Sequence, residues 1–174
     1  VNAITGTDAD IKTIKDNAEL LGLDLTAFNK LDDKTGQTGG RQTAVMKDLA
    51  ANKGTGFAKV EDLQKIFNSI VAVRTATQTS MDMVNDAETL ENIEYVEILL
   101  DAFKNAEHAM HGSDRMTKKI SDMQELVNDF NALGKADQAT VLAEVITARG
   151  TGFARSSATT DALRTAIDGL NQQP

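Results

Sequence analysis

The sequence of 174 residues contains no cysteine and no tryptophan, and its single proline is Pro174, the last residue. The lack of cysteine excludes disulfides, thiolate metal sites and cysteine nucleophiles, although it does not fix the cellular compartment. Without internal proline, long helices can run uninterrupted. Because aromatic residues make up only 4%, the core must be aliphatic and rich in alanine, which favours packed helices over sheets.

The formal net charge is −8, which disfavours binding of nucleic acid through a broad basic surface. No apolar run approaches the roughly 20 residues that cross a bilayer. The first ten residues are polar and acidic, unlike a signal peptide. We therefore expect a soluble chain without a membrane partner. Its length suits one domain, or two small domains that share a core.

The word GTGFA occurs twice, at 54–58 and 150–154, with a basic residue on either side each time. Around it, the 18 residues from Gln42 share seven identities with the 18 residues from Gln138. Upstream, AFNKL is matched by DFNAL, and the 16 residues from Gly6 share seven identities with those from Gly112. Collinear matches of this kind indicate an internal duplication.

The duplication predicts copy one over 6–73 and copy two over 112–171. Each copy is predicted to fold as a helix, a short helix, a longer helix, the GTGFA loop and a final helix. In copy one Thr7 is the expected N-cap, with Asp10 completing a partial capping box, and Gly22 the expected C-terminal stop.

The segment between the copies, 74–111, has no counterpart and is predicted to contain a central amphipathic helix. Its apolar stripe includes Leu90, Ile93 and Leu99, and its other face is acidic. We expect a single all-α domain, a helical bundle in which the two copies pack around this helix. The acidic positions Glu94 and Glu97 are candidates for contact with a basic partner, although a solvated helix face is the commoner explanation.

Two interpretations apply to the GTGFA loops. Glycine-rich turns at helix ends can present N–H groups to an anion, and Lys53 and Arg149 add positive charge there. Neither loop follows a predicted strand or has phosphate-loop spacing, however, and neither has the acidic pattern of a calcium loop. A helix-stopping glycine turn with a phenylalanine anchored in the core is the simpler prediction. The residues concerned are Lys53, Gly54, Gly56, Phe57, Arg149, Gly150, Gly152 and Phe153.

Neither metal binding nor catalysis is indicated by the remaining polar residues. His108 and His111 lie three residues apart near Asp114, but a metal site needs further ligands, and a histidine near a helix end also suits the helix dipole. Two histidines so close together complete no catalytic triad. We expect no enzyme, no cofactor and no metal.

The unit GTGFAKVEDLQKIFNSI, and again GTGFARSSATTDALRTAIDGL, resembles a pattern in bacteriophage tail, neck and other virion proteins. There, Gly-Thr-Gly-Phe leads into Asp-x-Leu and a helix containing isoleucine. Asp161 and Leu163 fit this pattern directly, whereas Asp62 and Leu63 are adjacent. The likeness covers about 20 residues in each copy. It implies a structural protein of the virus particle.

A second resemblance concerns the coat proteins of rod-shaped plant viruses. RGTG followed by RSS near the C-terminus, and QTGGR at 37–41, are similar to segments of that family. The family's aromatic-rich middle stretch is missing and an internal duplication is not its pattern. The resemblance would place Arg41 at RNA.

These observations lead us to expect a non-enzymatic virion component that assembles with itself or with other virion subunits, as a homo-oligomer. The alternative is a cytoplasmic helical adaptor or regulatory domain that binds a protein through its acidic helix.

Overall fold

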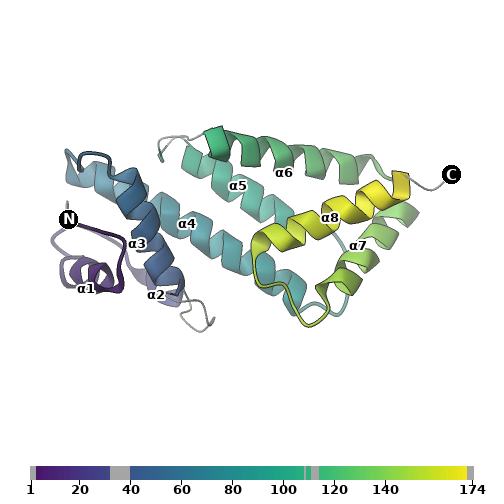
Figure 1. The fold of residues 1–174 in the computed structure, drawn as a ribbon, viewed down its shortest axis with the longest axis horizontal. Coiled ribbons are helices and arrows are strands. Elements are labelled where there is room, and N and C mark those ends of the chain that lie inside the picture. The colour runs from purple at the N-terminus through teal and green to yellow at the C-terminus, as the bar shows by residue number, and fades with distance from the viewer. Residues whose placement is uncertain (1–2, 32–39, 108, 111–113, 172–174) are drawn as a thin grey trace. The chain divides into compact units, whose positions relative to one another are not determined.

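The computed structural model describes residues 3–31, 40–107, 109–110 and 114–171 (Figure 1). Within these ranges it contains helices and no strand, which confirms the predicted all-α class. The helices are α1 (Asp8–Asp16), α2 (Thr26–Lys30), α3 (Arg41–Asn52), α4 (Val60–Asn85), α5 (Glu94–Glu107), α6 (Asp114–Ala132), α7 (Lys135–Arg149) and α8 (Ser156–Asn171). None of the helices in these ranges is both long and apolar enough to cross a membrane.

The chain divides into two compact units. The first unit comprises residues 1–75 and 105–112, and the second comprises 76–104 and 113–174. Predicted copy one falls within the first unit, and copy two falls within the second apart from its first residue. The segment without a counterpart is shared between them. The single domain, the duplication and the central position of the acidic helix stay predictions.

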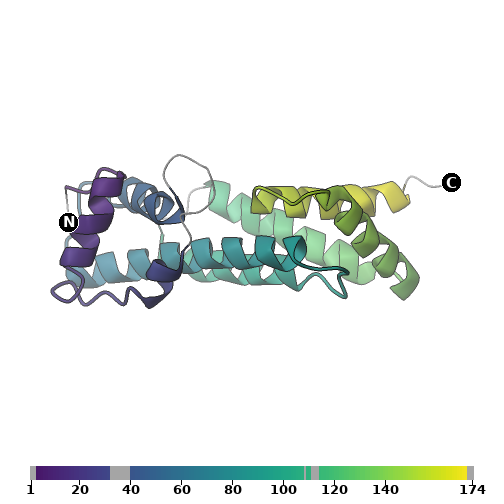
Figure 2. The ribbon, with the colours of Figure 1, turned by 90° about the horizontal axis from the view of Figure 1, so that it is seen from below.

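In the first unit, α1 packs against α3, and Figure 2 shows the two helices side by side. Thr7 is the N-cap of α1, as predicted, and its N–H donates to the Asp10 carboxylate at 2.8 Å. The Phe28 ring lies 5.5 Å from that of Phe67 in the buried cluster of this unit. The fully buried members of the cluster include Ile4, Ile14, Val45, Met46, Leu49, Leu63 and Ile70.

The first helix is shorter than predicted, because α1 ends at Asp16 and a turn over residues 17–22 replaces its last part. The Asn17 side-chain amide donates to the Thr13 carbonyl at 2.8 Å, which satisfies a carbonyl that a longer helix would have bonded. Gly22 has a φ of +59° at the end of this turn. The prediction that Gly22 ends the first helix is therefore wrong, because Asn17 is the C-cap of α1 and Gly22 ends the turn that follows.

In the second unit, α7 and α8 pack against each other around the second GTGFA loop, and α8 also packs against α6 (Figure 1). The separate short helix predicted for copy two is wrong, because DFNAL continues α6 as far as Ala132. In copy one Gly22 precedes the short helix, whereas in copy two no glycine interrupts the chain between Ser113 and Gly134. A helix without such a break runs on.

The acidic amphipathic helix is α5, which begins at Glu94, so Leu90 and Ile93 of the predicted apolar stripe precede it. Tyr95, Val96, Leu99 and Leu100 are buried on one side of it. Glu94, Glu97 and Asp101 are exposed on the other. The earlier part of the segment without a counterpart belongs to α4, which continues to Asn85.

Candidate functional site

The first GTGFA loop is a tight turn after α3. Lys53 is the C-cap residue, and the N–H of Gly56 donates to its carbonyl at 2.8 Å. Gly54 has a φ of +54° and Gly56 a φ of +132°, conformations that residues with a side chain rarely adopt. The Phe57 ring is half-buried and packs against the apolar cluster of the first unit.

The second GTGFA loop has the same backbone. The N–H of Gly152 donates to the Arg149 carbonyl at 2.9 Å, and φ is +55° at Gly150 and +133° at Gly152. Phe153 is half-buried against the apolar cluster of the second unit. In both units the loop thus ends one helix and leads into the next with a phenylalanine against the core.

The basic residues before the loops contact backbone carbonyls. The Arg149 guanidinium donates to the carbonyls of Val84 at 2.9 Å and Asn85 at 3.2 Å, and also to that of Ala87. It therefore caps the C-terminal end of α4, where a helix has unbonded carbonyls and a negative dipole end. In the first unit the Lys53 ammonium donates to the Ile4 carbonyl. Both cations thus have a structural use.

An asparagine side chain holds the second loop in place. The Asn85 amide oxygen accepts from the Phe153 N–H at 2.7 Å, and its NH₂ donates to the Phe153 carbonyl at 3.0 Å. A Cβ at Gly152 would stand 3.5 Å from the same side chain. The loop and the end of α4 are therefore fixed to each other by polar contacts on both sides of the phenylalanine.

Residues of the first loop line a shallow pocket of about 300 Å³ within the first unit. Three predicted candidates, Lys53, Gly56 and Phe57, come together there, beside Asp62 and Lys65. Its mixed charges give no preference for an anion or a cation. In the second loop, Arg149 and the Phe153 backbone are hydrogen-bonded to the end of α4 and the residues after it. The two loops therefore have different surroundings.

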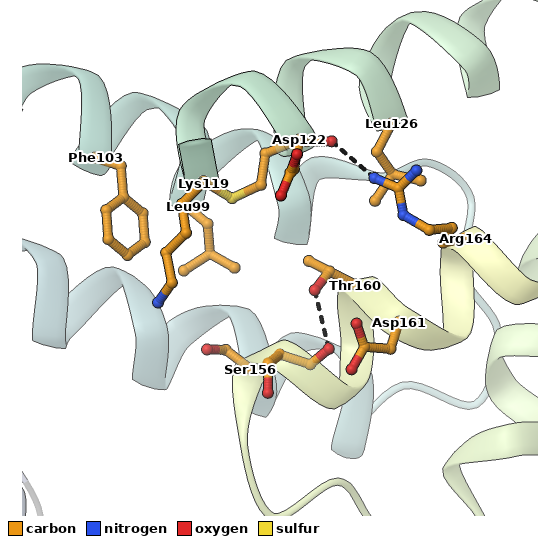
Figure 3. Close-up of a pocket in the computed structure, with 11 residues that line it drawn as sticks. Leu99, Phe103, Lys119, Asp122, Leu126, Ser156, Thr160, Asp161 and Arg164 are labelled. Carbon is orange, nitrogen blue, oxygen red and sulfur yellow. Dashed lines mark hydrogen bonds between the residues drawn. The ribbon is translucent and has the colours of Figure 1, made fainter. Parts of the chain in front are cut away.

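A second pocket, of about 220 Å³, lies among α5, α6 and α8 in the second unit (Figure 3). We call it the α5–α6–α8 pocket. Its apolar lining comes from α5 and α6, and its polar lining comes from the outer face of α6 and the first turns of α8. The lining residues are Leu99, Phe103, Lys119, Asp122, Met123, Leu126, Ser156, Ser157, Thr160, Asp161 and Arg164.

Three charged side chains around the α5–α6–α8 pocket contact other groups of the protein. The Lys119 ammonium lies 5.3 Å from the centre of the Phe103 ring, within cation–π range. The Arg164 guanidinium donates to the Asp122 carbonyl at 3.0 Å. The Asp122 carboxylate forms an ion pair with Lys118 at 2.8 Å. The rim therefore presents two cations and one further carboxylate, Asp161.

The pocket combines an apolar lining with charged side chains at its rim. Its volume of about 220 Å³ falls below the roughly 300–1,000 Å³ of typical small-molecule sites, so it suits one or two side chains of a partner. In the described ranges, no group of three or more His, Asp or Glu side chains is placed to hold a metal. An apolar floor with a charged rim is the usual composition of a small protein-docking site.

Sequence reasoning missed the α5–α6–α8 pocket, since none of its lining residues was among the predicted candidates. Leu99 was named only as part of an apolar stripe, and Asp161 only as part of the resemblance to phage virion proteins. Of the predicted acidic candidates, Glu94 and Glu97 are exposed on α5 and lie outside the pocket. Arg41 is the first residue of α3, and His108 and His111 lie outside the described residues.

Two titratable side chains are buried elsewhere. Burial acts to raise the pKa of Asp10, but hydrogen bonds from the backbone N–H groups of Thr7, Thr5 and Gly6 outweigh it and hold this pKa below its ordinary value. Burial raises the pKa of Tyr95 above its usual range. Neither side chain lines either of the two pockets described above.

No protein-family model matches the chain, and no curated protein or solved structure shows significant similarity to it. The two viral resemblances therefore rest on the quoted motifs alone.

Proposed function

We propose that this protein is a non-enzymatic structural protein that assembles with copies of itself or with other subunits of a virus particle. The observation that carries the proposal is the structural use of both GTGFA loops. In each unit the loop fixes two helices with the same glycine turn, packs its phenylalanine against the core and directs its basic residue to backbone carbonyls. A scaffold of this kind provides a rigid framework and a surface for contacts with other subunits.

The viral part of the proposal comes from the likeness of each loop and its following helix to units of phage virion proteins. In virus particles, repeated helical units present similar surfaces to repeated partners, and function follows from geometry alone. The α5–α6–α8 pocket supports an assembly role because its size and lining fit side chains of another protein.

The test is the behaviour of the purified chain over a wide concentration range. Light scattering and electron microscopy are expected to show a mass that rises with concentration and regular assemblies. The genes that flank this one are expected to encode capsid or tail subunits. A chain that stays monomeric at high concentration, and that co-assembles with none of the subunits encoded nearby, would contradict the proposal.

A second function, that of an adaptor, is favoured by the acidic side of α5. Glu94, Glu97 and Asp101 are all exposed there and could meet a basic partner surface. Binding of this kind weakens with salt because exposed charges are screened. A double variant, Glu94→Lys with Glu97→Lys, should abolish such binding and leave self-assembly unchanged, which separates the two proposals.

A further inference from the structure

Leu20 is the most exposed large apolar side chain in the parts of the chain that the structure describes. Its exposed fraction is 83%, and the next, that of Val60, is 43%. Burial of a leucine side chain away from water is favourable, so water is an unfavourable environment for this side chain. A single exposed leucine is common, and its meaning depends on how it is presented.

Hydrogen bonds within the turn and from α4 hold the backbone that carries Leu20. The N–H groups of Leu21, Gly22 and Leu23 donate to carbonyls of the same turn at 2.9, 3.1 and 2.9 Å. The Gln64 side chain donates to the Leu21 carbonyl at 2.6 Å and ties the turn to α4. Leu20 therefore projects from a preformed backbone, which lowers the entropic cost of inserting it into a partner.

The α5–α6–α8 pocket has the complementary shape and polarity. Leu99, Phe103, Met123 and Leu126 give it an apolar lining, and its volume of about 220 Å³ suits an aliphatic side chain. Figure 3 shows Phe103, Lys119 and Arg164 reaching the pocket from different sides. An aliphatic side chain entering it would exchange water for these apolar contacts.

The charges beside the two features are also complementary. Glu19 and Asp24, on either side of Leu20, are exposed carboxylates. Around the pocket stand the cations Lys119 and Arg164, the single further carboxylate Asp161, and the N-terminal end of α8, which carries the positive end of a helix dipole. The Asp122 carboxylate is neutralised by its ion pair with Lys118. Opposite charges of this kind favour one orientation of approach.

We infer that Leu20 of one copy inserts into the α5–α6–α8 pocket of a second copy. The inference rests on the proposed assembly function and specifies its contact. Because a projection on one surface meets a pocket on a different surface, the contact is heterologous. Each added copy then offers a new free pocket and a new free Leu20, so the copies form rings or open filaments.

The first experiment substitutes Leu20→Asp and follows the concentration dependence of mass by analytical ultracentrifugation. The dissociation constant is expected to rise by at least about tenfold, since burial of the leucine is lost and a charge is placed in the pocket. Val60→Asp is the matched control, because Val60 is the other exposed large apolar residue. Circular dichroism establishes that both variants are folded.

The second experiment blocks the pocket with Ser157→Trp, at an exposed position of its rim. Thr165→Trp is the control, on the same helix at an exposed position that does not line the pocket. Ser157→Trp should reduce assembly as strongly as Leu20→Asp, and Thr165→Trp should have no effect. A mixture of the Leu20→Asp and Ser157→Trp variants retains one intact contact, so it should form one-to-one dimers and nothing larger.

Each other outcome overturns the inference. If the wild type assembles and Leu20→Asp assembles equally well, the contact is wrong while the proposed function stands. If the mixture forms no dimer, Leu20 and the pocket are not partners of each other. If the wild type does not self-associate but co-assembles with other virion subunits, the inference fails and the proposed function survives. If neither kind of assembly occurs, both are wrong.

Discussion

The two GTGFA loops have the same backbone and different surroundings. Their glycines agree in φ to within one degree, with +54° and +132° in the first loop and +55° and +133° in the second. In the second loop, Arg149 donates to three carbonyls at and after the end of α4. In the first, Lys53 donates to the carbonyl of Ile4. Identical local sequence produced the same turn, whereas the tertiary neighbours came from unrelated segments.

A glutamine side-chain contact extends the comparison beyond the loops. The Gln42 amide donates to the Phe28 carbonyl at 3.2 Å, and the Gln138 amide donates to the Phe130 carbonyl at 3.1 Å. These four residues are in matching positions of the two predicted copies. Yet Phe28 lies in a separate short helix and Phe130 lies near the end of the long α6. The contact is thus compatible with two different lengths of the preceding helix.

The largest expected effect comes from the two matched phenylalanines, whose exposed fractions are 0% for Phe28 and 4% for Phe130. Phe28→Ala and Phe130→Ala should each lower the free energy of unfolding by about 3–5 kcal/mol, because each leaves a cavity in its own cluster. Hydrogen exchange should locate the loss in the first unit for Phe28→Ala and in the second for Phe130→Ala. Equal loss of protection in both units would show that they unfold together.

The next largest effect is a difference in unfolding free energy between variants of Arg149 and Lys53. Arg149→Ala should cost about 2–3 kcal/mol of unfolding free energy, since it leaves several carbonyls without their charged donor. Lys53→Ala should cost about 1 kcal/mol. Urea denaturation measures both, and Arg149→Lys is the control, because it keeps the positive charge but changes the shape and reach of the donor group. Equal costs at the two positions would mean that the surroundings of the loops matter little.

Substitution of the first glycine of each loop should lower the stability by a similar amount. Gly54→Ala and Gly150→Ala place a Cβ in open space but in a left-handed conformation, so each should cost about 1–2 kcal/mol. Gly169→Ala is the control, because Gly169 lies within α8, where alanine is favoured by about 1 kcal/mol. Unequal costs at Gly54 and Gly150, measured by thermal unfolding, would break the equivalence of the two turns.

The smallest effect concerns Asp10, which has no counterpart in the second unit because the matching position is Met116. Its pKa is lower in the folded chain than in the unfolded chain. It therefore stabilises the fold at pH values above its unfolded pKa, and this contribution disappears as the pH falls through its lower, folded pKa. Hydrogen exchange at acidic pH should show the loss at the start of α1. Asp10→Asn should remove this pH dependence, and an unchanged profile would disprove the role of Asp10.

Several features could be predicted because they depend on neighbours in the sequence. Thr7 and Asp10 cap a helix with their own backbone and side chains, so their pattern is sufficient. The place where α1 ends was missed because Asn17 also bonds the Thr13 carbonyl, and its pattern alone does not decide between helix and turn. The continuation of α6 through DFNAL was missed because the matched segment in copy one was taken as its template.

The candidate site was beyond sequence reasoning for a different reason. Leu99, Met123 and Arg164 have ordinary helical spacing in three separate helices, and nothing in that spacing indicates that they line one pocket. The exposure of Leu20 was equally hidden, since it sits in an apolar run beside the buried Leu21. The spacing of the apolar residues predicted Leu21 on the apolar face of a longer first helix.

The sequence by itself determined the all-α class, the helix-ending turns of GTGFA and the capping of the first helix. Each of these follows from backbone sterics, hydrophobic periodicity or hydrogen bonds within a few residues. Only the tertiary structure decided that Arg149 caps α4, that α5, α6 and α8 enclose a pocket and that Leu20 projects from a fixed turn. These features depend on which distant segments pack together, and packing is decided by the shapes of whole side-chain surfaces.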